Sequence, residues 1–92
     1  MKYIKIDPIQ ISFNYPRRST KMIVTTMESI YINPIHIALI QERKEEDYTG
    51  KRSFTSIGIT GVNEPIIIDM DIKKFIVLAE GARQEAMEVL YG

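Results

Sequence analysis

The chain contains no cysteine and no tryptophan. Without cysteine there can be no disulfide bond, no thiolate metal ligand and no cysteine nucleophile. The chain also has no excess of charge of either sign, because its 12 lysines and arginines balance its 12 aspartates and glutamates. A general electrostatic attraction to nucleic acid or to an anionic membrane is therefore not expected, although a local basic patch is compatible with this balance.

Long apolar runs are missing as well. No run approaches the roughly 20 residues that span a membrane, and the first residues, MKYIKIDPIQ, lack the continuous apolar centre of a signal peptide. The absence of disulfides in a small chain fits a reducing compartment. We therefore expect a cytoplasmic protein that does not associate with membranes.

Recognisable catalytic motifs are also absent. The sequence has no glycine-rich phosphate loop, no nucleophile elbow and no zinc-binding spacing. No set of residues stands out as a catalytic constellation. We therefore expect a protein that is not an enzyme and that uses no cofactor and no metal.

What the chain does contain is enough apolar material for one small core. Its 92 residues allow one domain, 1–92, and 45% of them are hydrophobic. Isoleucine dominates the apolar residues. Because isoleucine is β-branched, this composition favours strands.

Alternating apolar and polar residues predict several strands. Pro8 interrupts the first of them and, having no N–H group, is expected at a sheet edge or bulge. The charged segment 41–52 predicts a long hairpin loop. The segment 35–40 is apolar on both sides, which predicts a central strand. The expected strands are 3–15, 22–32 with a turn or bulge at 26–29, 35–40, 53–61 and 66–69.

The spacing of the apolar residues changes near the C-terminus. From Asp71 onward the apolar residues recur every three or four positions, which predicts an amphipathic helix capped by Asp69 or Asp71. Gly81 inside this pattern predicts a kink or a break. The expected fold class is α+β, a small antiparallel β-sheet or SH3-like barrel of about five strands with a C-terminal α-helix.

Two polar motifs invite a chemical interpretation. His36, the single histidine, follows the Asn33-Pro34 break in YINPIHIAL. A histidine acts as a base or metal ligand only with partners, and the pattern offers none, so we interpret His36 as a structural residue on a strand that bends at Asn33-Pro34. Asp69 and Asp71 have a spacing that could hold a hard cation, but acids at the start of a helix are the ordinary explanation of this spacing, and we favour that interpretation.

The predicted helix has more apolar surface than a single packed face requires. Val77 and Leu78 fall outside the main apolar stripe, and either deeper burial or a contact with another protein could explain them. A self-association or partner surface would consist of Val77, Leu78, Met87, Leu90 and Tyr91.

Two basic segments, 16–21 and 51–54, support an alternative. Cations that follow phosphates and aromatic rings that stack on bases are typical of single-stranded nucleic-acid binding. The residues of this candidate interface are Tyr15, Arg17, Arg18, Lys21, Lys51, Arg52 and Phe54. The acidic neighbours at 45–47 weaken this interpretation.

Three segments, IYINPIHIALIQE, SFTSIGITG and PIIIDMDIKKFIVL, together resemble the small flagellar FlbD/SwrD family. Asn33, Ile37 and Ile40 carry most of this likeness, and the extra N-terminal strand and the longer 41–52 segment depart from the family pattern. The resemblance implies a small β-rich regulatory or adaptor protein and supplies no catalytic residue.

These observations lead to one expected function and one alternative. We expect a non-enzymatic regulatory or adaptor protein that acts through protein–protein contacts and forms a homo-oligomer. The alternative is nucleic-acid binding through the two basic segments. Salt separates the two, because phosphate contacts weaken steeply as the salt concentration rises.

Overall fold

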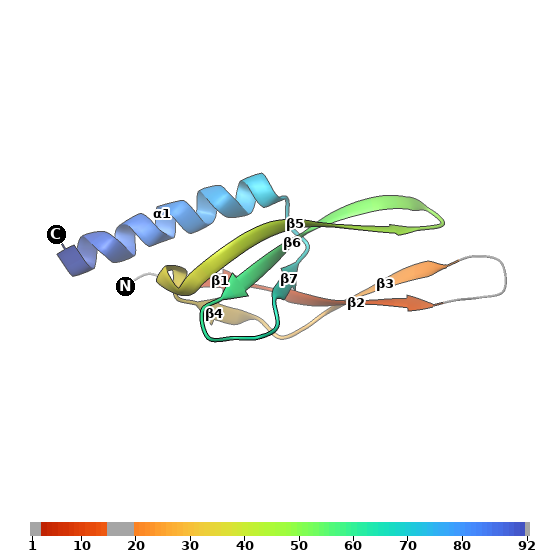
Figure 1. Cartoon of the computed structure of the whole chain (residues 1–92), viewed down its shortest axis with the longest axis horizontal. Helices are drawn as coiled ribbons and strands as arrows, with labels where there is room; N and C mark the ends of the chain where they lie inside the picture. Colours follow the sequence, from red (N-terminus) through yellow and green to blue (C-terminus); the bar gives the residue numbers. More distant parts are fainter. Residues whose placement is uncertain (1–2, 15–19, 92) are drawn as a thin grey trace.

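The computed structural model describes the backbone of residues 3–14 and 20–91 and the side chains of 3–14 and 20–84. The molecule is elongated, with extents of 59 × 21 × 19 Å. Its radius of gyration of 15.5 Å exceeds the roughly 12 Å of a compact domain of this length. The C-terminal helix extends toward one end of the molecule and two β-hairpins extend toward the other (Figure 1).

Within the described residues, the strands form two antiparallel sheets. A two-stranded sheet pairs β1 with β4, and a five-stranded sheet has the order β3-β2-β7-β6-β5. With the C-terminal helix, this arrangement confirms the predicted α+β class. The strands are β1 (Ile4–Ile6), β2 (Pro8–Asn14), β3 (Lys21–Thr26), β4 (Ile30–Ile32), β5 (Ile37–Asp47), β6 (Gly50–Ile59) and β7 (Ile66–Ile68).

Two of the predicted strands are each divided between the two sheets. The first breaks at Asp7, so that β1 and β2 pair with different partners. The second breaks at 27–29, as the expected turn suggested. The prediction of a sheet edge or bulge at Pro8 is wrong, because Pro8 begins β2, an inner strand. The first position of a strand tolerates the missing N–H group.

The predicted loop at 41–52 is wrong. These residues continue β5 and β6 into a long hairpin whose pairs run as far as Asp47 and Gly50. The chain reverses at Tyr48-Thr49, and Gly50 follows with a φ of 132°, a backbone conformation that favours glycine. The strands remain polar here because both faces of this part of the hairpin are largely exposed. A polar strand gives no hydrophobic periodicity, so its composition predicted a loop.

The bend at Asn33-Pro34 is confirmed, but its geometry differs from the prediction. Pro34–His36 form a short 3₁₀ helix, and the Asn33 side chain accepts a hydrogen bond from the Ile35 N–H at 3.2 Å. The strand predicted at 35–40 therefore begins at Ile37. It is an outer strand and not a central one.

An irregular register in β5 explains why its apolar residues misled the prediction. The pairing with β6 shifts between Ile37 and Leu39. Ile37 and Ile40 consequently pack against the core, whereas Leu39 is exposed. A bulge of this kind changes which side chains face inward.

The helix α1 (Ile72–Tyr91) covers the end of the molecule formed by β1 and β4. Phe75, Ala79 and Ala82 are buried against isoleucines of the strands, among them Ile4 and Ile57. Asp71 accepts a hydrogen bond from the Lys73 N–H at 3.2 Å, which confirms it as a cap. The expected kink or break at Gly81 is wrong, because α1 is continuous through it.

A second core cluster lies between the two hairpins and contains Ile9, Met22, Phe54 and Ile67. At the tips, the Tyr48 N–H donates to the Thr20 carbonyl at 3.1 Å, and the Met22 N–H donates to the Asp47 Oδ2 at 3.0 Å. The two outer strands of the larger sheet, β3 and β5, are thereby joined at this end of the molecule.

Candidate functional site

The outer side of α1 carries Val77 and Leu78, two residues of the apolar surface that the sequence predicted. Val77 and Leu78 are 71% and 44% exposed in the single chain. Deeper burial within one chain therefore does not account for them. Met87, Leu90 and Tyr91 lie farther along α1, in the part of the helix whose side chains fall outside the described residues.

The start of β1 lies beside these two residues. Tyr3, Lys5, Val77, Leu78 and Gly81 line a shallow cleft whose floor is formed by Ile4 and Ala82. Lys74 lies one turn before Val77 and Leu78 on the same side of the helix. We name the surface formed by Tyr3, Lys5, Lys74, Val77, Leu78 and Gly81 the helix surface.

Gly81 has no evident role in the packing of the single chain. A Cβ atom built at this position has no described neighbour within 4 Å. Glycine inside a helix costs about 1 kcal/mol relative to alanine, mainly through backbone entropy. Its missing side chain does leave space beside Val77 and Leu78 for a side chain of another molecule.

A second apolar surface, which the sequence analysis missed, is formed without any residue of α1. It is a groove with a volume of about 630 Å³ between the β3–β4 connection and the β6–β7 connection. Met27 and Val62 project into solvent there and are 52% and 53% exposed. We name it the acidic groove after Glu28 and Glu64, which line it together with Met27, Ile30, Val62 and Ile66.

Little in the sequence indicates the acidic groove. Met27 and Val62 are isolated apolar residues inside polar turns and are 35 positions apart, so no periodicity connects them. The pairing of β2 and β6 with β7 brings the two connections together. Only an excess of apolar residues in predicted turns could have indicated this surface.

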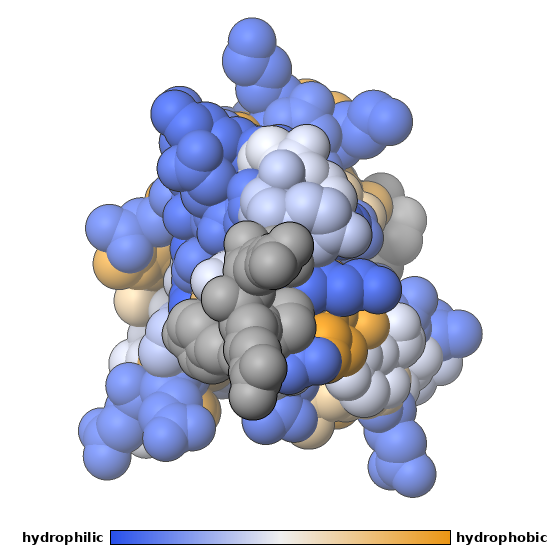
Figure 2. Space-filling model, turned by 90° about the vertical axis from the view of Figure 1, so that its right-hand side faces the viewer, coloured by the Kyte–Doolittle hydropathy of each residue, from blue (hydrophilic) through white to orange (hydrophobic). Residues whose placement is uncertain are grey.

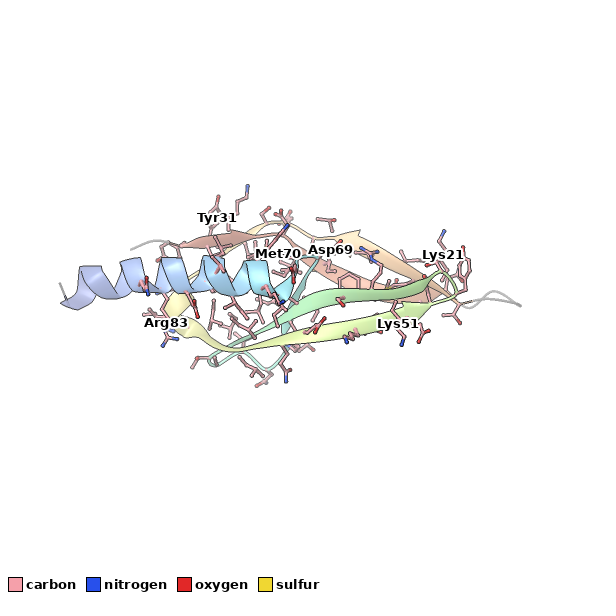
Figure 3. All side chains as sticks on the ribbon, turned by 90° about the horizontal axis from the view of Figure 1, so that it is seen from above. Lys21, Tyr31, Lys51, Asp69, Met70 and Arg83 are labelled. Atoms are coloured by element: carbon pink, nitrogen blue, oxygen red, sulfur yellow. The ribbon has the colours of Figure 1, made fainter. Side chains whose placement is uncertain are left out.

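The fold brings Lys21 and Lys51 of the predicted nucleic-acid interface to the same end of the molecule but buries Phe54. Lys21 and Lys51 are exposed near the hairpin tips (Figure 3). Arg52 instead pairs with Asp69 at 2.9 Å and lies over the Phe54 ring at 5.0 Å. Phe54 is 1% exposed, so its assignment as a base-stacking residue is wrong. Tyr15, Arg17 and Arg18 lie outside the described residues.

The surface at the hairpin end is mainly hydrophilic (Figure 2). Acidic and basic side chains alternate there, since Glu45 and Glu46 face Arg52 and Lys51 across the hairpin. Asp47 bonds to Thr49 and to the Met22 N–H, and these hydrogen bonds lower the pKa of its carboxyl group below the usual value. The described part of this end therefore presents mixed charge.

His36 is exposed at the end of the 3₁₀ turn and not on a strand as predicted. Its described hydrogen bonds are made by the backbone, where its carbonyl accepts from the Thr60 N–H at 2.8 Å. Of the two aspartates, Asp71 caps α1 and Asp69 pairs with Arg52. Among the described residues, no group of three or more histidine, aspartate or glutamate side chains could hold a metal ion.

Comparison with protein-family models, with curated proteins and with solved structures gives no match to this chain. The resemblance to the flagellar FlbD/SwrD family therefore stays a prediction. Within the described part of the chain, no helix combines the length and apolar character needed to cross a bilayer. The functional interpretation accordingly depends on the two exposed surfaces.

Proposed function

We propose that this protein is a small non-enzymatic adaptor or regulatory protein that acts through protein–protein contacts and self-associates through the helix surface. The observation that carries the proposal is the exposure of Val77 and Leu78 beside Gly81. Two large apolar side chains next to a helix glycine form a surface that gains free energy when another molecule covers it.

The cost of Gly81 supports the same conclusion. The glycine lowers the stability of the helix, and the described side chains of the single chain leave the space above it open. A close approach by another molecule is a physical reason for such a residue. The helix surface thus combines exposed apolar area with room for an incoming side chain.

Nucleic-acid binding receives less support. Phe54 belongs to the core between the hairpins, and Arg52 is engaged by Asp69 and by the Phe54 ring. Lys21 and Lys51 remain, but acidic residues of β5 lie next to Lys51. Among the described residues, the proposed phosphate-binding surface therefore lacks its stacking ring, and one of its cations is paired with Asp69.

The test is the oligomeric state of the full chain, measured by sedimentation equilibrium over a wide range of concentrations. The wild type is expected to associate, and Leu78→Asp is expected to sediment as a monomer because the charge opposes burial of this surface. Ile23→Asp is a matched control, since Ile23 is 42% exposed but lies on β3, away from the helix surface. The control is expected to associate like the wild type.

Circular dichroism spectra and thermal unfolding verify that both variants are folded. A folded Leu78→Asp variant whose mass equals that of the associated wild type would contradict the proposal. A wild type that remains monomeric at all concentrations would contradict it as well.

A further inference from the structure

The helix surface and the acidic groove carry opposite charge. Lys5 lines the helix surface and Lys74 lies one turn before Val77 and Leu78, whereas Glu28 and Glu64 line the acidic groove. All four are exposed, and none forms an ion pair with another side chain that the structure describes. Each surface also has protruding apolar side chains, Val77 and Leu78 on one and Met27 and Val62 on the other.

The two surfaces are formed by different parts of the chain. In Figure 1, α1 lies above the strands, and the β6–β7 connection lies at the lower edge of the molecule. The two sets of lining residues have no member in common. Because Phe75 and Ala79 hold α1 on its own core, the helix cannot reach the acidic groove of the same chain.

We propose that the helix surface of one copy docks into the acidic groove of a second copy of this chain. Val77 and Leu78 enter the groove beside Met27 and Val62, and Lys5 and Lys74 lie against Glu28 and Glu64. This inference rests on the proposed self-association and names the surface that the helix covers. Burial of apolar side chains supplies the affinity, and the opposite charges fix which surfaces meet.

This contact joins two different surfaces and therefore leaves one of each free in every pair. Further copies can add at both ends, and the assembly becomes a closed ring or a filament depending on the rotation between neighbours. A contact between two identical helix surfaces would instead stop at a dimer. The masses of the assemblies and of mixed variants distinguish the two arrangements.

The first experiment mixes two full-length variants, each defective in one surface. Leu78→Asp places a charge in the helix surface, and Val62→Asp places a charge in the acidic groove. Each variant by itself is expected to be a folded monomer. Their equimolar mixture is expected to form a 1:1 dimer, because the Val62→Asp chain retains its helix surface and the Leu78→Asp chain retains its groove.

The outcomes separate this inference from the proposed function. If Val62→Asp assembles like the wild type while Leu78→Asp is monomeric, the acidic groove is not the docking site, although self-association through the helix surface stands. A mixture that remains monomeric also overturns the inference. If Leu78→Asp assembles like the wild type, both proposals are wrong.

The second experiment reverses charges. Glu28→Lys with Glu64→Lys is expected to raise the dissociation constant at least about tenfold, because like charges then face each other. Adding Lys5→Glu and Lys74→Glu in the same chain is expected to restore association. A charge-reversed groove that leaves the dissociation constant unchanged, or a quadruple variant no tighter than the groove variant, would overturn the assigned pairing.

Discussion

The carboxylate of Asp47, at the end of β5, accepts a hydrogen bond from the backbone N–H of Met22, at the start of β3, with a length of 3.0 Å. The two residues belong to different hairpins and to the two outer strands of the larger sheet. This contact fastens the hairpins to each other at the end of the molecule farthest from α1.

The Asp47 contact predicts a dependence of stability on pH. Bonds from the Thr49 side chain and from the Met22 N–H lower the pKa of Asp47 in the folded protein. Its stabilising contribution is therefore present above the unfolded pKa of about 3.9 and is lost as the pH falls through the lower folded pKa. Urea unfolding midpoints of the wild type and of Asp47→Asn, measured between neutral and acidic pH, test this. The difference between the two unfolding midpoints should shrink in acid. A difference that stays constant at every pH would show that protonation of Asp47 does not affect this contact.

Replacing Phe54 distinguishes a core residue from a base-stacking residue. Phe54→Ala leaves a cavity between the hairpins and is expected to lower the free energy of unfolding by about 3–5 kcal/mol. Tyr48→Ala is the control, because the Tyr48 side chain is exposed at the hairpin turn and its loss should change stability by no more than about 0.5 kcal/mol. Chemical denaturation measures both. Equal stability of the two variants would contradict the packing of Phe54.

Gly81→Ala is expected to have opposite effects on folding and association. The added methyl group has no described neighbour within 4 Å, so the free energy of unfolding of the monomer should rise by about 1 kcal/mol. The same group reduces the space beside Leu78 and should weaken self-association. Gln84→Ala, at an exposed position one turn later, controls for the general effect of alanine on α1. A variant that is more stable and associates as tightly as the wild type would show that no partner approaches Gly81.

His36→Ala is expected to leave both stability and association nearly unchanged. The His36 side chain is exposed, and its described hydrogen bonds involve only the backbone, which alanine retains. The expected change in the free energy of unfolding is within about 0.5 kcal/mol. Chemical denaturation and sedimentation measure the two properties. A folded variant that no longer self-associates would give His36 a functional role.

The sequence predicted the secondary structure correctly where it depends on a local pattern alone. The alternation around Ile4, Ile6 and Ile9 produced strands, and the three-and-four spacing around Phe75 and Ala79 produced the helix. It failed at 41–52, where exposed charged residues form strands because their backbone pairs with the facing strand of the hairpin. Pairing of this kind depends on the register of the hairpin and leaves no hydrophobic pattern in the sequence.

The residues of the two candidate surfaces were likewise predictable from the sequence only in part. The excess of apolar residues on the helix was visible as Val77 and Leu78, but their exposure depended on which helix face the sheets covered. The acidic groove required two turns from distant parts of the chain to meet around β7. Phe54 was assigned to a surface because it follows a basic segment, whereas the pairing of β6 directs it into the core.

By itself the sequence determined the α+β class, the C-terminal helix and the bend at Asn33-Pro34, since each depends on residues a few positions apart, whereas the structure decided that Asp71 and not Asp69 caps the helix. The tertiary structure alone decided that β5 is an outer strand, that Phe54 is buried and that Met27 and Val62 share a groove. Those properties depend on contacts between distant segments, and local propensity and periodicity carry no information about such contacts.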